Sequence, residues 1–298
     1  MISIIIVTYN SIAVLPSCLR ALSASQGANH FDVIVVDNAS SDDTCAWLDT
    51  FITEDRHGYA SITSIKLEEN RGFAYANNRG LEQAAGDHLL LLNPDTEVEP
   101  TTILSIARLL DDDSGVGVAG CRLVLRDGRL DQACRRSFPT LWNSFTRMSG
   151  LSLLFPRSQW LASYNLTYLD EYQSYEVDCI SGAFLMIRKI VYDTIGGLDE
   201  DFFMYGEDID WCYRIKKSGY RVLYDGTVST LHLKGANGGK RSDESLRSFY
   251  DTMLLYYQKH YAGSNIVIMQ IIIKSVLWSL YQLNRVKNKL KYTGEYFR

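Results

Sequence analysis

ISIIIVTYNS (residues 2–11) and VIVVDNASSD (residues 33–42) are the two stretches that decide the fold. Each opens with a largely β-branched run and ends in a polar turn, and helical spacing follows over Ile12–Ala24 and Asp43–Ile52. The unit recurs, with predicted strands at Ile62–Leu67 and His88–Leu92 and a helix at Phe73–Ala85. Because apolar strands alternate with helices, we expect an α/β fold with a mainly parallel sheet flanked by helices.

The second half of the chain is less regular. Strands are predicted at Val116–Leu125, Val177–Ile187 and Arg221–Tyr224, and helices at 206–219 and Asp243–Tyr261. A weakly patterned, aromatic-rich stretch separates the first two of these strands. No linker rich in Pro or Ser divides this region, so residues 1–265 are expected to form one domain.

Charge is distributed unevenly along the chain. The 298 residues carry a formal net charge of -5, which argues against a protein that coats nucleic acid over its whole surface. Residues 266–298 hold six basic side chains and the single acid Glu295, so this segment carries +5 and the rest carries −10. The six cysteines form no Cys-x-x-Cys pair, which favours reduced thiols and a cytoplasmic protein.

Short acids and amides follow the predicted strands. Asp37 and Asn38 come after the second strand, and Asn93 and Asp95 come after the fourth. The carboxyl ends of parallel strands meet at one edge of a sheet, which is where α/β proteins bind ligands. The chain has neither GxGxxG after its first strand nor GxxxxGK[ST], so neither a dinucleotide site nor a P-loop is predicted.

Asp95 is a candidate metal ligand. A carboxylate repels a diphosphate unless a divalent cation lies between them, and Mg²⁺ and Mn²⁺ prefer such oxygen ligands. The alternative is turn chemistry, because Asn-Pro-Asp at 93–95 is a natural turn. His232 follows a strand-like run and has two interpretations as well, a ligand or a hydrogen-bonded structural histidine.

The densest group of reactive side chains is FFMYGEDIDWCYR, residues 202–214. Glu207 and Asp208 follow a glycine and aromatic residues, an arrangement that can bring a carboxylate into a pocket where it accepts a proton. A structural explanation also exists, because acids in a first helical turn favour the helix dipole and Asp210 can pair with Arg214. It accounts well for Asp210 and leaves Glu207 and Asp208 as catalytic candidates.

Six motifs occur in order along the chain: IIIVTYN (4–10), VVDNASSD (35–42), NRGFA (70–74) with Asn77, LLNPD (91–95), GAF (182–184) and YGEDID (205–210). Together they resemble the family 2 inverting glycosyltransferases of GT-A fold, especially the rhamnosyltransferase-like branch, over about residues 2–235. The resemblance implies a Rossmann-like catalytic domain at 1–265. Its nucleotide-sugar-binding half would span about 1–112 and its acceptor-binding half 113–265.

The resemblance also implies roles for individual residues. Donor binding falls to Thr8, Asn10, Asp37, Asn38, Arg71, Asn77, Asn93 and Asp95, with Asp37 expected to contact the pyrimidine ring. Asp208 matches the catalytic base, and Glu207 is a second catalytic candidate or an acceptor ligand. Gly182 and Trp211 fall in the acceptor site. Asp95 and His232 would hold Mg²⁺ or Mn²⁺, and Asn93 replaces the first acid of the usual DxD motif.

The implied activity is inverting transfer of a sugar from a nucleotide donor to a hydroxyl of a growing, lipid-linked cell-surface polysaccharide such as an O-antigen. The expected donor is dTDP-L-rhamnose, and a UDP-hexose or UDP-galactofuranose is the alternative. A different class of protein, a non-catalytic sugar-nucleotide-binding protein of the same fold, is disfavoured because Asp95, Asp208 and His232 are all present. No nucleic acid partner is expected.

The segment 266–298 is predicted to be an amphipathic, basic helix. At 100° per residue an uninterrupted apolar arc of about 140° holds Ile266, Met269, Ile272, Ile273, Val276, Leu277, Leu280 and Leu283. Lys274 disfavours a membrane span, while the basic residues at 285–291 suit anionic headgroups, so we expect peripheral attachment to the inner face of the cytoplasmic membrane. The alternative is a helix that covers the catalytic domain or a dimer interface, and a homo-oligomer stays open.

Overall fold

The structure is a computed structural model that describes residues 1–54, 57–234, 243–261 and 267–295. Its first half alternates strands with helices, as the sequence pattern predicts. The strands are β1 (Ile2–Thr8), β2 (Phe31–Asp37), β3 (Ser61–Lys66), β4 (His88–Leu92) and β5 (Thr96–Val98). The helices are α1 (Leu15–Ser23), α2 (Thr44–Thr53), α3 (Phe73–Gln83) and α4 (Thr102–Asp112), with a 3₁₀ turn at Ala28–His30.

The second half contains strands of very unequal length and ends in two long helices. Its strands are β6 (Val116–Val124), β7 (Arg135–Arg136), β8 (Tyr175–Val177), β9 (Cys179–Ile180), β10 (Phe184–Arg188) and β11 (Arg221–His232). Its helices are α5 (Leu141–Met148), α6 (Leu151–Leu154), α7 (Lys189–Ile195), α8 (Glu207–Lys217), α9 (Asp243–His260) and α10 (Val267–Glu295).

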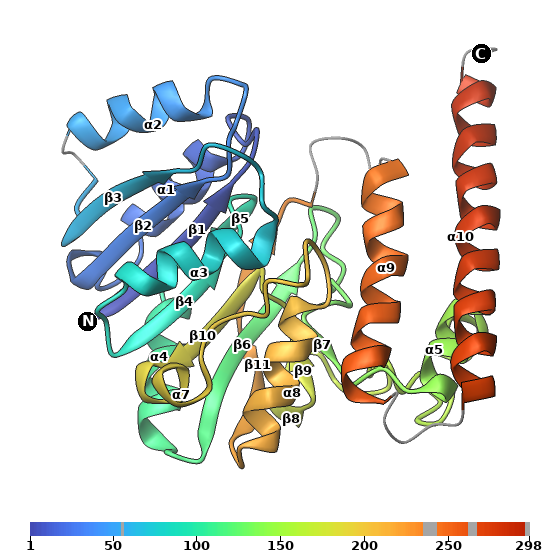
Figure 1. The fold of residues 1–298 in the computed structure, drawn as a ribbon. Helices are drawn as coiled ribbons and strands as arrows, with labels where there is room; N and C mark the ends of the chain where they lie inside the picture. Colours follow the sequence, from blue (N-terminus) through green and yellow to red (C-terminus); the bar gives the residue numbers. More distant parts are fainter. Residues whose placement is uncertain (55–56, 235–242, 262–266, 296–298) are drawn as a thin grey trace.

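Across the described residues, nine strands form one sheet in the order β3-β2-β1-β4-β10-β6-β11-β5, with β8 paired to β11 (Figure 1). β3, β2, β1, β4, β6 and β11 run in one direction, and β10, β5 and β8 run against them. The prediction of a mainly parallel sheet is therefore confirmed. A second, two-stranded sheet pairs β7 with β9.

The predicted strand at Val177–Ile187 is wrong, because the structure divides it into β8, β9 and β10. The backbone turns after β9, where the amide of Phe184 donates to the carbonyl of Ser181 (3.2 Å). β9 pairs with β7, whereas β10 enters the large sheet between β4 and β6. Both flanks of the turn are buried, so the apolar pattern does not reveal it.

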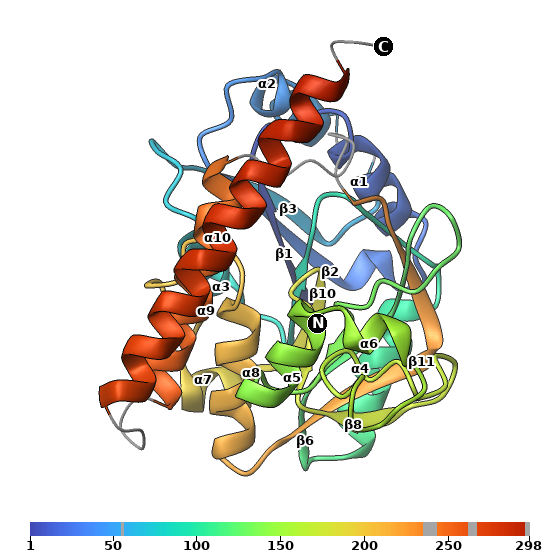
Figure 2. The same ribbon diagram turned by 90° about the vertical axis from the view of Figure 1, so that its right-hand side faces the viewer.

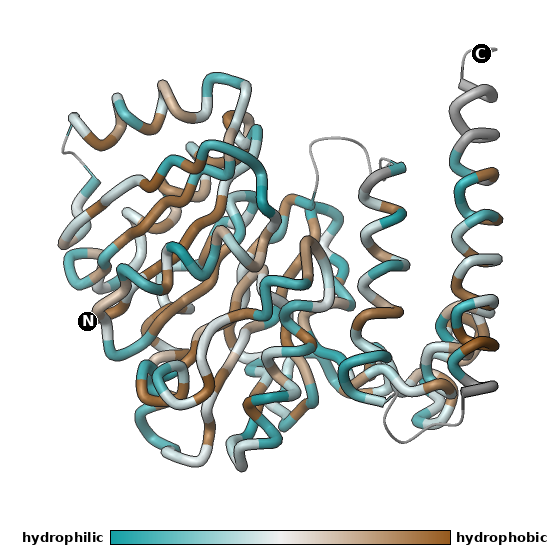
Figure 3. Tube along the Cα trace, viewed as in Figure 1, coloured by the Kyte–Doolittle hydropathy of each residue, from teal (hydrophilic) through white to brown (hydrophobic). Residues whose placement is uncertain are grey.

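The core lies between the sheet and helices on both of its faces. In Figure 2 α3 and α8 lie on one side of the sheet, and α1 and α4 lie on the other. Every residue of β1 and of β4 is buried, and the central strands are the most hydrophobic segments in Figure 3. Burial on both faces explains why these strands have continuous apolar sequences.

Helices α9 and α10 pack against each other beside the sheet (Figure 1). Leu277 of α10 is buried against Leu246 and Tyr250 of α9, and Ile273 and Leu280 pack on the same cluster. Part of the predicted apolar arc therefore packs on protein, as the alternative interpretation has it.

The rest of the arc of α10 is only half covered. Ile272, Val276 and Leu283 are 49%, 50% and 51% exposed. Ile266, Arg298 and the side chains of Met269, Lys287, Lys289 and Lys291 lie outside the described residues. In the described part of the chain, no helix combines the length and hydropathy that crossing a membrane requires.

Asp210 joins α8 to α9. Its Oδ2 accepts a hydrogen bond from Arg214 Nε (2.8 Å), which confirms the predicted pair within α8. Its Oδ1 contacts Nε2 of His260 on α9 (2.8 Å). The Asp210 side chain is almost fully buried, so it is a structural link and not part of the cleft described below.

Gly72 offers a test of how tightly α3 is held at the start of the helix. Its φ is +91°, and a Cβ there would lie 2.3 Å from the carbonyl oxygen of Phe203. We expect Gly72→Ala to lower the free energy of unfolding by about 3 kcal/mol, since left-handed strain adds to a backbone clash.

Gly219→Ala is the matched control, because Gly219 has the same φ of +91° and nothing within 4 Å of the added Cβ. It should cost about 1 kcal/mol, the left-handed strain alone. Urea denaturation of both variants measures the difference. Equal losses would show that the approach of Phe203 does not constrain the helix.

Candidate active site

A cleft of about 2510 Å³ opens at the carboxyl ends of the parallel strands. It extends past β7 and the start of α8 to α9 and α10. Its lining includes eight of the residues that the sequence singles out, from both halves of the chain: Asn10, Asn38, Asn93, Asp95, Gly182, Glu207, Asp208 and His232.

Parallel pairing aligns the ends of β1 and β2. Thr8 lies opposite Asp37, and its hydroxyl donates to Asp37 Oδ1 (3.0 Å). Asp37 Oδ2 accepts from the amide of Ser40 (2.9 Å). Asn38 then reaches the loop before α3, where its side-chain amide donates to Asn70 Oδ1 (2.9 Å). These bonds fix the two loops that form one wall of the cleft.

Four predicted donor residues do not line the cleft. Thr8 and Asp37 are buried, and Asn77 is buried within α3 with its amide bonded to a carbonyl of the same helix. Arg71 stacks over the ring of Tyr75, 3.9 Å from its centroid. Their roles in donor binding stay predictions.

Trp211 requires a correction. Its side chain has no exposed surface, and its indole N–H donates to the carbonyl of Gly196 (2.9 Å). A side chain without exposed surface cannot contact an acceptor. The predicted acceptor role is therefore wrong, and Trp211 is a core residue of α8.

A chain of charged groups lies where β5 and β11 pair. His232 Nε2 is 3.3 Å from Asp95 Oδ1, and its Nδ1 is 2.9 Å from Asp131 Oδ2. Lys234 Nζ donates to Asp131 Oδ1 (2.6 Å). Burial alone would lower the pKa of His232, but the bonds with Asp131 and Asp95 outweigh it and raise that pKa to about 9.

Asp95 can hold a divalent cation that takes further ligands from a substrate, and His232 can join it as a ligand once its Nε2 proton is released. In the described ranges no group of three or more His, Cys, Asp or Glu residues is arranged to hold a metal. Asn93 Oδ1, however, is buried and has no hydrogen-bond partner among the described residues. A buried, unpaired amide oxygen that lines the same cleft as the Asp95 carboxylate suits Mg²⁺ or Mn²⁺, which commonly keep phosphate oxygens and water as ligands.

A strained turn begins the second group of functional side chains. Tyr205 and Gly206 both have positive φ, +70° and +81°, immediately before α8. The turn directs Glu207 and Asp208 toward the cleft at the first helical positions. Backbone strain of this kind is retained where the surrounding structure requires a particular side-chain direction.

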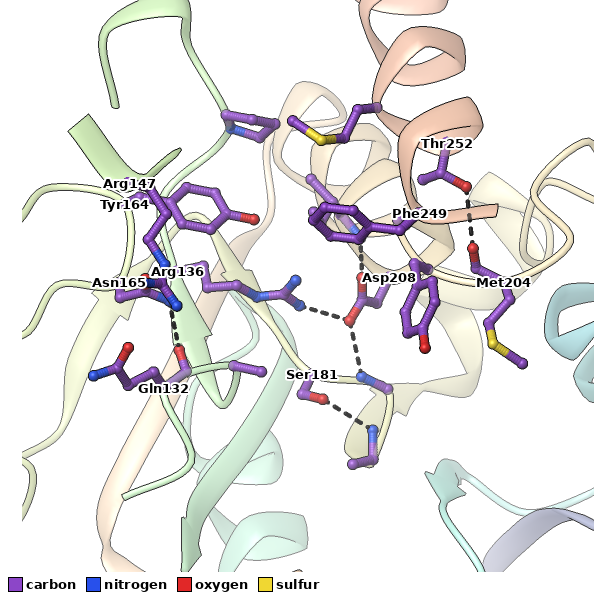
Figure 4. A pocket seen from close by; sticks show the side chains of 18 of the residues that line it. Gln132, Arg136, Arg147, Tyr164, Asn165, Ser181, Met204, Asp208, Phe249 and Thr252 are labelled. Carbon is purple, nitrogen blue, oxygen red and sulfur yellow. Dashed lines mark hydrogen bonds and ion pairs between the residues drawn. The ribbon is translucent and has the colours of Figure 1, made fainter. Parts of the chain in front are cut away.

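Asp208 is bonded through both carboxylate oxygens (Figure 4). Oδ2 accepts from Arg136 Nη2 (2.6 Å) and from the amide of Gly182 (3.2 Å). Oδ1 accepts from the amide of Ile209 (2.8 Å). The turn between β9 and β10, which the sequence did not predict, thus supplies a hydrogen-bond donor to the predicted base.

Glu207 differs from Asp208 although the two are adjacent. Burial and, next, the negative charge of Asp208 raise the pKa of Glu207 to about 8. Its Oε2 is buried without a hydrogen-bond partner among the described residues. Glu207 is therefore a neutral acid at pH 7, with one oxygen that can bond an incoming group.

Sequence reasoning missed Arg136 and Asp131. Both lie in the stretch between β6 and α5, which has no regular apolar pattern. Each acts through a residue far along the chain, Asp208 and His232 respectively. No feature of a single sequence indicates such a contact, although a buried arginine requires a charged or polar partner.

Asp131 provides a test of the charged chain at β11. We expect Asp131→Asn to lower the free energy of unfolding at pH 7 by about 3 kcal/mol, because His232 and Lys234 lose a buried countercharge. Burial opposes ionisation of Asp131, but the bonds from His232 and Lys234 outweigh it and lower its pKa. Its contribution is therefore complete above its usual pKa of 3.8 and is lost as the pH falls below that value.

Urea denaturation at pH 7 and at pH 3 measures the effect of Asp131→Asn. Asp127→Asn is the control, since Asp127 pairs with Arg129 at the surface of the same segment and should leave stability unchanged. If Asp131→Asn is as stable as the wild type at pH 7, the carboxylate does not hold His232.

Known proteins resemble this chain in sequence and in fold. The family model for glycosyl transferase family 2 matches residues 3–196. The uncharacterized protein y4gI of Sinorhizobium fredii is 27% identical over 269 residues, which cover 88% of this chain and 27% of that protein. N-acetylglucosaminyl-diphospho-decaprenol L-rhamnosyltransferase of Mycobacterium tuberculosis is 24% identical over 271 residues, which cover 87% of this chain and 85% of that protein.

Among solved structures, the mannosyltransferase PcManGT of Pyrobaculum calidifontis, in complex with GDP-Man and Mn²⁺, matches with a TM-score of 0.62. The match has 17% sequence identity and covers 94% of this chain and 71% of that chain. A likeness at this identity supports the fold alone, and it agrees with the expected GT-A architecture. Because the family model covers well over half of its residues, this chain belongs to glycosyl transferase family 2.

Proposed function

We propose that this glycosyltransferase moves a sugar, with inversion, from a nucleoside diphosphate donor to a hydroxyl of a glycan acceptor. The observation that carries the proposal is the cleft itself, whose lining includes Asp95 and His232 as well as Asp208. Asp95 and His232 suit a diphosphate with its cation, and Asp208 suits an acceptor hydroxyl. A single displacement requires the donor-binding residues and the base to line the same cavity, because donor and acceptor react directly with each other.

The proposed reaction is one displacement. Asp208 takes the proton of the acceptor hydroxyl while the oxygen of that hydroxyl forms the new bond to the anomeric carbon. The bond between that carbon and the phosphate oxygen breaks, and its electron pair leaves with the nucleoside diphosphate. Attack opposite the leaving group inverts the anomeric centre, and no covalent sugar–enzyme intermediate is required.

Asp95 and His232, with Asn93 nearby, would hold Mg²⁺ or Mn²⁺. The cation, when bound, would neutralise charge on the departing diphosphate. Lys234 is anchored to Asp131 beside this edge and would add a further positive charge toward the same phosphates.

The proposed donor is dTDP-L-rhamnose and the proposed acceptor is lipid-linked. The name of the mycobacterial relative, an L-rhamnosyltransferase acting on a diphospho-decaprenol sugar, supports a rhamnosyl donor and a lipid-linked acceptor. The cleft also continues from Asp208 to apolar residues of α5 and α10, including Phe145 and Ile272, which suits an acceptor with a lipid portion. A UDP-hexose or UDP-galactofuranose is the competing donor.

Asp208→Asn tests the proposed base. The variant should lose transfer by about 10²–10⁴-fold, since an amide keeps the shape of the carboxylate but cannot take the proton. Donor binding, measured as the rise in melting temperature with nucleotide and Mn²⁺, should be retained. Glu207→Gln should be milder. Release of nucleoside diphosphate from a panel of dTDP- and UDP-sugars, with a lipid-linked acceptor, measures activity.

Three results would contradict the proposal. Full turnover by Asp208→Asn would assign the base to another residue. Release from a UDP-sugar alone would replace the proposed donor. Binding of donors without any transfer by the wild type would favour the non-catalytic alternative.

We also propose that the enzyme works at the inner face of the cytoplasmic membrane through α10. Ile271 and Trp278, one above the other two turns apart on α10, are 58% and 65% exposed. The double variant Ile271→Ser, Trp278→Ser should reduce cosedimentation with phosphatidylglycerol vesicles by tenfold or more. Burial of each apolar side chain in the membrane would contribute about 2 kcal/mol to the free energy of binding, and serine would remove that contribution. The melting temperature should not change.

Leu277→Ala is the control, because Leu277 faces α9. It should lower the melting temperature and leave vesicle binding intact. If the double variant cosediments as the wild type does, the exposed face of α10 is not the membrane contact.

A further inference from the structure

Arg136 reaches the predicted base from a different part of the fold (Figure 4). It belongs to β7, where it pairs in register with Cys179 of β9. Its Nη2 donates to Asp208 Oδ2 (2.6 Å) and to the carbonyl of Ile180 (3.2 Å). The side chains of Arg136 and Asp208 are only 11% and 12% exposed, so this ion pair is largely shielded from water.

Three ionisable neighbours of the pair, Tyr164, Cys179 and Glu207, are kept neutral at pH 7 by raised pKa values. Tyr164, which Figure 4 shows beside Arg136, and Cys179 of β9 both have pKa values raised, first of all by burial. Glu207, the neighbour on α8, has its pKa raised to about 8. Burial opposes the charge of Arg136, but Asp208 outweighs it and raises the pKa of Arg136 well above its usual value.

Among the described residues, Arg136 is the cation bonded to this pair of adjacent buried carboxyl groups, and it bonds to Asp208. Like charges side by side in a buried site cannot both ionise readily, so one proton stays on the pair near pH 7. Arg136 contacts Asp208, while Glu207 Oε2 has no partner in the described part of the chain. The contacts thus favour the ionised form of Asp208 over the ionised form of Glu207.

We propose that Arg136 is a positioning residue that keeps the negative charge of this pair on Asp208 and, with the Gly182 amide, holds Oδ2 so that Oδ1 takes the acceptor proton. The inference rests on the proposed role of Asp208 as the base. Oδ1 accepts only the Ile209 amide among the described residues and retains a lone pair for the incoming hydroxyl. Glu207 remains protonated and free to orient the acceptor.

The experiment compares pH profiles of kcat/KM for the wild type, Arg136→Gln and Arg136→Lys. The acidic limb is the part of the profile where kcat/KM falls as the pH is lowered and Asp208 becomes protonated. Arg136→Gln removes the guanidinium that stabilises the ionised carboxylate, so this limb should move to higher pH by about one unit or more. Activity near pH 7 should fall by tenfold or more and recover in part near pH 9, with KM for the donor unchanged. Arg136→Lys keeps a charge and should keep the acidic limb near its wild-type position.

Glu207→Gln provides a second measurement that does not depend on the folding of an Arg136 variant. Glu207 is already neutral across the acidic limb, so Glu207→Gln should leave the limb where it is. In the Arg136→Gln background, Glu207→Gln removes the competing carboxyl group and should restore part of the lost activity. Arg135→Gln is the matched control, because Arg135 is buried on the same strand and, in the described structure, donates its hydrogen bonds to carbonyls and lies over the ring of Tyr224.

A limb that stays in place in Arg136→Gln, with activity lowered equally at every pH, would overturn the inference. A shift of the acidic limb in Glu207→Gln alone, or in Arg135→Gln, would also overturn the inference. Full turnover by Asp208→Asn would instead refute the proposed base. An inactive Asp208→Asn together with an unshifted Arg136→Gln profile would refute only the role of Arg136.

Discussion

The in-register parallel pairing of β1 with β2 and β4 is the constraint on which the cleft depends. Thr8 ends β1 opposite Asp37 at the end of β2, and β4 ends immediately before Asn93. A shift of one residue in this pairing would separate Thr8 from Asp37 and displace the polar strand ends from one another. Burial of every residue of β1 on both faces makes such a shift costly.

The antiparallel strand β10 then connects the two halves of the site. It pairs with β4 on one side and with β6 on the other. The turn before it is tied to the end of β4, because the amide of Asn93 donates to the carbonyl of Ala183 (3.1 Å). The same turn presents the Gly182 amide to Asp208. One short segment therefore links the side of the cleft proposed to hold the diphosphate to the side that carries the proposed base.

The sequence predicted the first half of the fold well because its signals are local. A buried strand, a polar turn and an amphipathic helix are each visible within about ten residues, and β4 appears at its predicted bounds. The predicted bounds fail at Val177–Ile187, where burial on both sides of a turn removes the contrast in polarity. Trp211 was misassigned for a related reason, since its place in an acidic motif says nothing about the direction of its side chain. Arg136 and Asp131 act across the fold, so only the three-dimensional arrangement reveals them.

The first turn of α8 has two carboxylates with separate tasks. Asp208 points to the cleft and is held by Arg136, while Asp210 points to α9 and is held by His260 and Arg214. The backbone joins them rigidly, because both lie in the first hydrogen-bonded turn of one helix. A displacement of α9 must therefore break the Asp210–His260 contact or carry the start of α8 with it. Motion of the helical pair α9–α10 is thus coupled mechanically, through α8, to the position of the Asp208 carboxylate in the cleft.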